Sequence, residues 1–221
     1  MKHKKIQCEK DKDHTMNLDY LLYLPENYDS KEQWPLILFL HGAGEIGDDL
    51  EQVKEQGLPK KLEEGEAMPF IVISPQCPSH THWGMHFDAL YELIQEIKKE
   101  YAVNHNKVYL TGLSMGGYGT WAMALKYLNE FAALVPICGG LRNHDHVTDL
   151  KNIPIWAFHG LQDHVVPISE TQKIVDKLQA CDGNIKFTIY PDKRHDSWTE
   201  TYNNKDVYAW LLKQERKPSK I

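Results

Sequence analysis

The sequence predicts an α/β fold, in which helices cover both faces of a mostly parallel, eight-stranded sheet. Short apolar runs alternate with amphipathic helical patterns, and several of these runs are apolar at every position. No repeat, low-complexity segment or linker divides the 221 residues. A continuous apolar run is typical of a strand buried on both faces of a parallel sheet. Because strands alternating with helices form right-handed crossovers in one sheet, we expect a single domain over residues 1–221.

Eight runs are expected to form the strands. Residues 36–40 read Leu-Ile-Leu-Phe-Leu and are apolar throughout, whereas residues 5–9 are the weakest candidate. The full set comprises residues 5–9, 18–24, 36–40, 70–74, 107–111, 132–138, 153–159 and 185–190.

Helical patterns separate these strands. Ser169 and Gln172 have the spacing of a capping box, which predicts a helix start at this point. Val207, Trp210 and Leu211 predict a final amphipathic helix. Apolar side chains at steps of three and four predict another helix over residues 87–101, namely Phe87, Leu90, Tyr91, Ile94, Ile97 and Tyr101.

The charge balance excludes some partners. Lys and Arg total 25 against 31 Asp and Glu, a net charge of −6. We therefore expect no nucleic-acid partner and no docking on anionic membranes, since both need clustered basic residues. No apolar stretch follows the basic start of the chain, so we expect no signal peptide. The four cysteines form no C-x-x-C pair, which is typical of a reducing cytoplasm, so the predicted location is cytoplasmic.

Ser114 is the predicted nucleophile. It lies in Gly112-Leu113-Ser114-Met115-Gly116, directly after an apolar strand and directly before a helical pattern. This is the strand–turn–helix context that a G-x-S-x-G nucleophile requires. A serine at such a turn has a strained backbone, and glycines two positions before and after it leave the necessary room.

Asp163 and His195 are the predicted partners of Ser114. A serine hydroxyl needs a base, the base needs a carboxylate, and for this turn the chain order is Ser, Asp or Glu, then His. Asp163 and His195 follow two successive predicted strands, so both are expected at the sheet edge that carries Ser114. The competing carboxylates are Asp145, Asp149 and Asp182, and the competing bases are His159 and His164. We prefer His195 because it alone follows the acid on a separate loop.

The oxyanion hole is expected beside the third predicted strand. Residues 41–44, His-Gly-Ala-Gly, follow that strand, and their glycines allow the backbone to turn toward the serine. The amides of Ala43 and Met115 are the predicted donors. For His41 we expect a structural, hydrogen-bonded role, since Ser114 already has a base.

These segments resemble the α/β-hydrolase superfamily, and specifically small carboxylesterases of the phospholipase/carboxylesterase and polyhydroxybutyrate-depolymerase-like kind. That group includes acetyl- and feruloyl-type esterases. The resemblance covers nearly the whole chain, through residues 22–25, 41–45, 74–78, 112–117, 160–167 and 195–198, with Trp83. It implies hydrolysis of a small-molecule ester without a cofactor. Unlike many secreted relatives, the chain has no evident disulfide pair.

Loop residues beside the predicted site are expected to shape the substrate pocket. These are Gln76, Trp83 and Trp198, for which turn and packing roles are the alternative. The histidine pairs at residues 80/82 and 144/146 have no third ligand at fixed spacing, so no metal is expected.

The sequence thus predicts a serine carboxylesterase for short-chain or small soluble esters. Residues 140–152 are too short and polar for a helical lid, and the charged residues 44–68 predict a solvated helix rather than an acyl tunnel. Two alternatives stay open. One is an amidase or peptidase that uses the same residues, and the other is a non-catalytic carbohydrate-binding module that uses the six tryptophans.

Overall fold

A computed structural model describes residues 18–30 and 32–216, in which seven strands form one twisted sheet. Their order across the sheet is β1-β3-β2-β4-β5-β6-β7. β1 runs antiparallel to β3, and the other neighbouring pairs are parallel. The predicted strand at residues 5–9 lies outside the described residues. The strands are β1 (Tyr20–Tyr23), β2 (Trp34–Leu40), β3 (Ile71–Pro75), β4 (Val103–Leu113), β5 (Ala133–Ile137), β6 (Ile155–Gly160) and β7 (Ile185–Tyr190).

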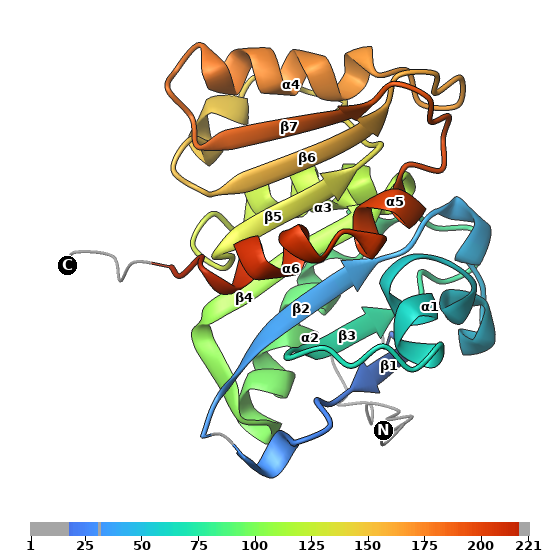
Figure 1. Ribbon diagram of the computed structural model, residues 1–221, viewed down its shortest axis with the longest axis vertical. Coiled ribbons are helices and arrows are strands. Elements are labelled where there is room, and N and C mark those ends of the chain that lie inside the picture. The colour runs from blue at the N-terminus through green and yellow to red at the C-terminus, as the bar shows by residue number, and fades with distance from the viewer. Residues whose placement is uncertain (1–17, 31, 217–221) are drawn as a thin grey trace.

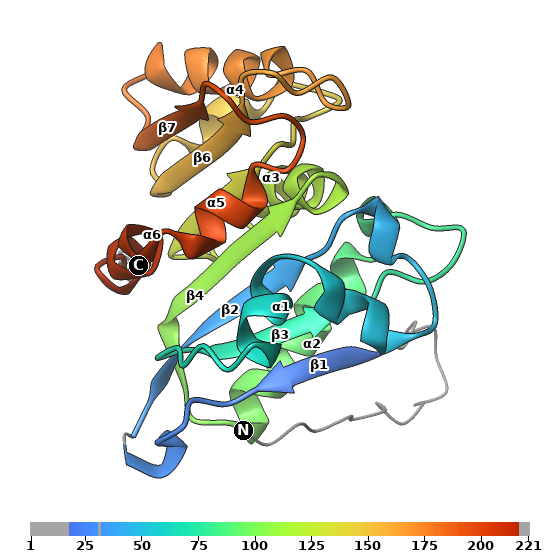
Figure 2. The same cartoon turned by 45° about the vertical axis from the view of Figure 1, so that its right-hand side comes forward.

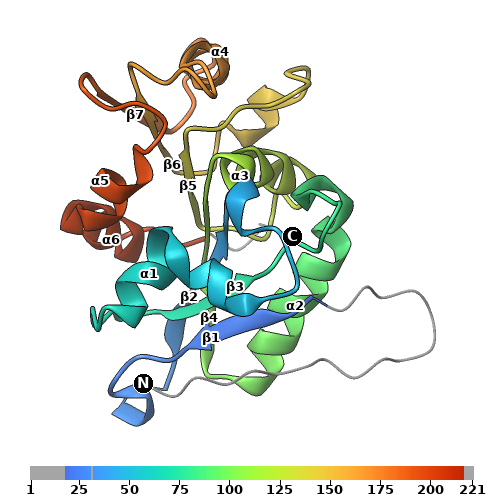
Figure 3. The same cartoon turned by 90° about the vertical axis from the view of Figure 1, so that its right-hand side faces the viewer.

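Helices cover both faces of this sheet, as the prediction required (Figure 1; Figure 3). One face carries α2 (Phe87–Glu100), α3 (Met115–Lys126) and α4 (Ser169–Gln179), and the other carries α1 (Gly57–Glu63), α5 (Trp198–Asn203) and α6 (Lys205–Leu212). Each face has its own apolar core. Because side chains alternate along a pleated strand, β2 contributes to both cores. Leu36, Leu38 and Leu40 face the first, and Ile37 and Phe39 the second.

The helix predicted to start at Ser169 is confirmed, but the capping box predicted there is wrong. Ser169 is the first residue of α4, Ile168 precedes it as the N-cap, and no side chain caps this end. The side-chain amide of Gln172 donates instead to the carboxylate of Asp176, one turn further along the helix. The buried Thr171 hydroxyl donates to the carbonyl of Gly139 at 2.6 Å. A tertiary contact, rather than a local cap, therefore holds the first turn of α4.

The charged segment at residues 44–68 is more buried than its composition predicts. It forms a 3₁₀ helix (Leu50–Glu55) followed by α1, rather than one solvated helix. Leu50, Val53, Leu58 and Leu62 turn inward and join the second core. The charges therefore occupy one face of an amphipathic segment that packs on the sheet.

The connections leave one edge of the sheet accessible. β2, β4, β5, β6 and β7 are parallel, so their carboxyl ends meet at the same edge (Figure 2). Between β5 and β6 the chain forms only a short 3₁₀ turn (Val147–Leu150).

No helix in residues 18–30 or 32–216 is long and apolar enough to cross a bilayer.

Candidate active site

Ser114 occupies a strained turn between β4 and α3. Its backbone angles are φ 53° and ψ −114°, a region that residues other than glycine rarely adopt. A Cβ at Gly116 would lie 1.9 Å from the carbonyl oxygen of Leu40, and one at Gly112 would lie 2.4 Å from the carbonyl oxygen of Gly116. Only glycine fits either position. The expected steric reason for the G-x-S-x-G spacing is therefore present in the fold.

The structure brings the three predicted catalytic residues together. His195 Nε2 lies 2.9 Å from Ser114 Oγ, and His195 Nδ1 lies 2.7 Å from Asp163 Oδ2. Ser114 follows β4, Asp163 follows β6 and His195 follows β7, so three separate strand ends supply the group. The acid and base are 32 residues apart along the chain but in direct contact. The ring of His195 also meets Trp198 edge-on, at 5.3 Å between ring centroids.

The surroundings of Asp163 favour the ionised carboxylate. Its side chain is fully buried, which raises its pKa, but hydrogen bonds from His195 and the amides of Val166 and Val165 outweigh burial and lower the pKa below its ordinary value. The two amides donate to Oδ1 at 2.9 Å each. An ionised Asp163 needs a donor at Nδ1 of His195, which leaves Nε2 to accept a proton from Ser114.

A second histidine contacts the same carboxylate. His159 is fully buried at the end of β6, with Nε2 3.3 Å from Asp163 Oδ2 and 2.8 Å from the carbonyl oxygen of Val166. Its Nδ1 lies 2.8 Å from the hydroxyl of Thr171. Burial lowers the pKa of His159. The loop after β6 engages Nε2 and helix α4 engages Nδ1, so His159 orients the carboxylate rather than competing with His195 as the base. Sequence reasoning weighed His159 only as a competing base and missed this contact.

The two predicted oxyanion donors begin helices. Met115 is the first residue of α3, and Ala43 is the first residue of a 3₁₀ turn (Ala43–Glu45) after β2. The first amides of a helix have no partner within it, so both are available to a ligand. The turn lies against the nucleophile, because a Cβ at Gly42 would lie 3.7 Å from Cβ of Ser114. A hole made of these two amides is consistent with this position.

His41 holds the oxyanion turn in place, the role expected for it. The side chain is fully buried, and burial lowers its pKa to about 4, so the ring is neutral at pH 7. Its Nδ1 donates to the carbonyl of Gly42 at 2.6 Å, and its Nε2 accepts from the amide of Cys77 at 2.9 Å. These bonds join the turn after β2 to the loop after β3.

A cavity of about 700 Å³ opens beside Ser114. One face of α3 forms its floor, where Met115, Tyr118, Gly119, Ala122 and Leu125 recur at helical spacing. Further walls come from the loop before α2 with the start of that helix, from the segment after β5 and from the first turn of α4. They comprise His82, Trp83, Gly84, Phe87, Gly140, Leu141, Arg142, Asn143 and Glu170. The cavity is thus mostly apolar, with polar side chains from three separate segments in its walls.

Of the three predicted pocket residues, only Trp83 lines this cavity. Gln76 is buried, and its amide donates to the carbonyls of Glu45 and Asp49 at 2.9 Å each. Trp198 donates to Gln56 at 3.1 Å and packs against the second core. The substrate-pocket role expected for Gln76 and Trp198 is therefore not supported by their positions. Both brace loops, as their packing alternative described.

The profile of one protein family, the dienelactone hydrolase family, matches residues 82–212. That span is more than half of the chain, and it contains Ser114, Asp163 and His195. The chain belongs to the dienelactone hydrolase family. It therefore belongs to the α/β-hydrolase superfamily, and the resemblance stated from the sequence is confirmed.

Proteins that are similar in sequence to this chain include esterases. A bifunctional acetylxylan esterase/xylanase XynS20E of Neocallimastix patriciarum is 25% identical over 207 residues, covering 87% of the chain and 28% of the relative. A probable feruloyl esterase C of Aspergillus terreus is 27% identical over 172 residues, covering 75% and 62%. The chain thus spans less than two thirds of either relative.

Solved structures give the same fold. The crystal structure of a thermostable esterase matches with a TM-score of 0.81 and 32% identity, covering 97% of the chain and 63% of that protein. A putative dienelactone hydrolase from Klebsiella pneumoniae matches with a TM-score of 0.71 at 16% identity, covering 90% of the chain and 94% of that protein. Because the Klebsiella pneumoniae protein is only 16% identical, its likeness to the chain concerns the fold alone. The α/β-hydrolase fold expected from the sequence is confirmed.

Proposed function

We propose that the chain is a serine carboxylesterase that hydrolyses short-chain or small soluble carboxylic esters through an acyl-enzyme intermediate. One observation carries this proposal. A single imidazole, that of His195, bridges Ser114 Oγ at 2.9 Å and the buried carboxylate of Asp163 at 2.7 Å. A hydroxyl, a base and an oriented acid in hydrogen-bond contact are what nucleophilic acyl transfer requires.

The reaction follows from these positions. His195 Nε2 takes the proton of Ser114 as the oxygen attacks the ester carbonyl, and Asp163 stabilises the resulting imidazolium. The amides of Ala43 and Met115 bind the developing oxyanion. His195 then protonates the leaving alcohol and removes a proton from the water that releases the acid. No cofactor takes part in these steps.

The cavity and the relatives support a small ester as the substrate. Aromatic and aliphatic side chains line most of the cavity, including Trp83, Phe87 and Leu141, while Arg142 and Asn143 lie exposed at its side. The connection between β5 and β6 contains a 3₁₀ turn and no helical lid. Relatives named as acetylxylan and feruloyl esterases make acetylated and feruloylated sugars the first natural esters to test.

A chain-length series tests the substrate class. We expect kcat/KM on p-nitrophenyl acetate, butyrate, octanoate and palmitate to be highest at eight carbons or fewer, because an open cleft does not enclose a long apolar chain. No rate increase is expected where the substrate exceeds its solubility. A maximum at palmitate with such an increase would identify a lipase instead.

Covalent labelling tests the reaction class. A fluorophosphonate should inactivate one site per chain in the wild type and should not label Ser114→Ala. Comparing a naphthyl ester with an aminoacyl anilide separates an esterase from an amidase or peptidase that uses the same residues. Labelling without turnover of any ester would contradict the proposal and favour the amide substrates.

A further inference from the structure

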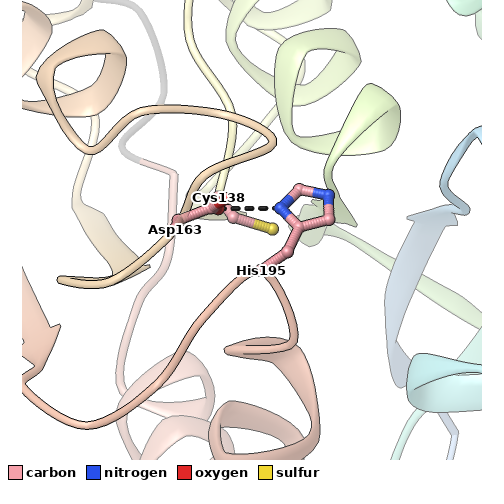
Figure 4. A group of neighbouring side chains, drawn as sticks. All are labelled: Cys138, Asp163 and His195. Atoms are coloured by element: carbon pink, nitrogen blue, oxygen red, sulfur yellow. Dashed lines mark hydrogen bonds and ion pairs between the residues drawn. The ribbon is translucent and has the colours of Figure 1, made fainter.

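A buried cysteine lies beside the triad and has no part in the reaction above. Cys138 follows β5 and is fully buried, with a positive φ of 41° that is uncommon for a residue with a side chain. Figure 4 shows its sulfur next to the imidazole of His195, on the side that faces Asp163. The sulfur, one ring nitrogen of His195 and one carboxylate oxygen of Asp163 all lie within 4.8 Å of one another.

The environment of this sulfur is polar for a buried thiol. The hydroxyl of Ser197 interacts with the thiol, is fully buried, and has no hydrogen-bond partner of ordinary geometry among the described residues. Burial raises the pKa of Cys138 to about 12, so the thiol is neutral at pH 7. The sulfur lone pairs and the Ser197 hydroxyl, which has no well-formed hydrogen bond, therefore remain able to ligate an ion next to the catalytic pair.

Thiolate, imidazole and carboxylate together are the ligand types that zinc prefers in proteins. We propose that Cys138, His195 and Asp163 form an inhibitory binding site for Zn²⁺ or a similar thiophilic ion such as Cd²⁺. The fourth ligand position is open to water or to the Ser197 hydroxyl. This group is the one set of three candidate ligands in residues 18–30 and 32–216, so neither histidine pair that the sequence analysis considered and set aside competes with it there.

Binding needs a small movement of His195. Ligand bonds of about 2.1 Å in a tetrahedral site separate nitrogen and oxygen by roughly 3.4 Å, whereas Nδ1 and Oδ2 are now 2.7 Å apart. His195 is the residue that can move, because its side chain is 20% exposed and that of Asp163 is fully buried. The ion therefore enters past the imidazole ring.

Occupancy removes the catalytic base. As the sulfur–metal bond forms, the thiol of Cys138 releases its proton to solvent. His195 stays neutral, but the metal takes the lone pair at Nδ1 and the ring proton moves to Nε2. Nε2 then donates to Ser114 Oγ and cannot accept its proton. Because the metal must displace a thiol proton, its affinity is lower than at a preformed thiolate, and we expect inhibition that a chelator reverses.

Cobalt gives a readout that does not depend on activity. Added to the metal-free full chain, Co²⁺ is expected to bind once per chain by equilibrium dialysis and to show thiolate-to-cobalt charge-transfer absorption in the near ultraviolet. Cys138→Ser should lose this absorption, and Cys181→Ser, the matched control at a half-buried cysteine after α4, should keep it. A chain in which Cys138 is the only cysteine should also keep it, which decides the matter if Cys138→Ser does not fold.

Inhibition supplies a second readout, and this one rests on the proposed esterase activity. The Zn²⁺ concentration that halves each variant's own metal-free rate should rise at least about tenfold in Cys138→Ser and stay unchanged in Cys181→Ser, and EDTA should restore the rate. Equal sensitivity of Cys138→Ser and wild type, or absence of the cobalt absorption, would overturn the proposal. Loss of zinc sensitivity in His82→Ala alone would place the ion in the cavity instead. If no ester is turned over, the cobalt result still decides the metal site.

Discussion

One His-Gly pair directly follows β2 and another ends β6, and the two pairs stabilise different parts of the site. His41 and His159 are both fully buried, and burial lowers the pKa of each. His41 bonds to backbone groups on two loops and holds the oxyanion turn. His159 bonds to its own loop and contacts Asp163 at 3.3 Å. The third histidine of the site, His195, is partly exposed and is the one that reaches Ser114.

The comparison shows that burial and partners, not residue type, assign a histidine its role. A histidine ring whose two nitrogens both bond to fixed atoms of the fold has a structural role, because it has no site left for a reacting proton. The ring of His195 lies between a hydroxyl and a carboxylate, so it can accept a proton from the hydroxyl and later release it. Because the His195 side chain is partly exposed at the carboxyl ends of the strands, the substrate can reach it.

The largest expected effect belongs to the histidine between Ser114 and Asp163. His195→Ala and Ser114→Ala should each lower kcat on p-nitrophenyl acetate by at least ~10³, because binding and the oxyanion hole alone remain. Asp163→Asn should be severely impaired, with circular dichroism unchanged in all three. Asp145→Asn is the matched control. Near wild-type activity of Asp163→Asn, with loss in Asp145→Asn, would show that the acid is misassigned.

The next effect separates His41 from exposed histidines by stability. Its pKa is about 4 in the folded chain and about 6.5 when unfolded, so only the unfolded state takes up its proton in this window. Above pH 6.5, the titration of His41 therefore does not reduce the free energy of unfolding. As the pH drops from 6.5 toward 4, the unfolded state takes up this proton first, so the free energy of unfolding falls by about 3 kcal/mol.

Urea unfolding at pH 7 and at pH 4.5 measures this loss. His41→Gln should show a smaller decrease than the wild type, and His105→Gln, at an exposed position, should not differ from it. Burial raises the pKa of the neighbouring Glu45, which gives stability the opposite slope, so the difference between variants is the quantity to compare. Equal slopes in His41→Gln and wild type would mean that His41 is not held neutral.

The smallest of these effects concerns His159 and catalysis. The 3.3 Å contact of His159 with Asp163 is weaker than a hydrogen bond to a charged group, whose loss costs about 1.5–3 kcal/mol, so His159→Leu should lower kcat/KM by at most roughly tenfold. The loss should lie in kcat rather than KM, because His159 orients Asp163 and does not line the cavity. His159→Gln, which keeps a donor, should recover part of it. His164→Leu is the exposed control, and unchanged kinetics in His159→Leu would assign the orientation of Asp163 to the amides of Val165 and Val166 alone.

Local steric rules made much of the site predictable. The G-x-S-x-G spacing identified Ser114 because the close approach of Gly112 and Gly116 to neighbouring backbone excludes any side chain. The order of strands and loops pointed to Asp163 and His195, and the structure brings both to Ser114. The prediction failed where a polar side chain had to choose a distant partner. Gln76 and Trp198 bond to Asp49 and Gln56, residues 27 and 142 positions away in the chain.

The sequence by itself determined the elements and the nucleophile's turn, because apolar periodicity and glycine sterics act over a few neighbouring residues. Only the tertiary structure decided the antiparallel pairing of β1 with β3, the floor of the cavity on α3, the contact of His159 with Asp163 and the place of Cys138 beside the triad. Each of these depends on which strand ends become neighbours. That choice is made by the packing of the whole sheet, and no short stretch of sequence records it.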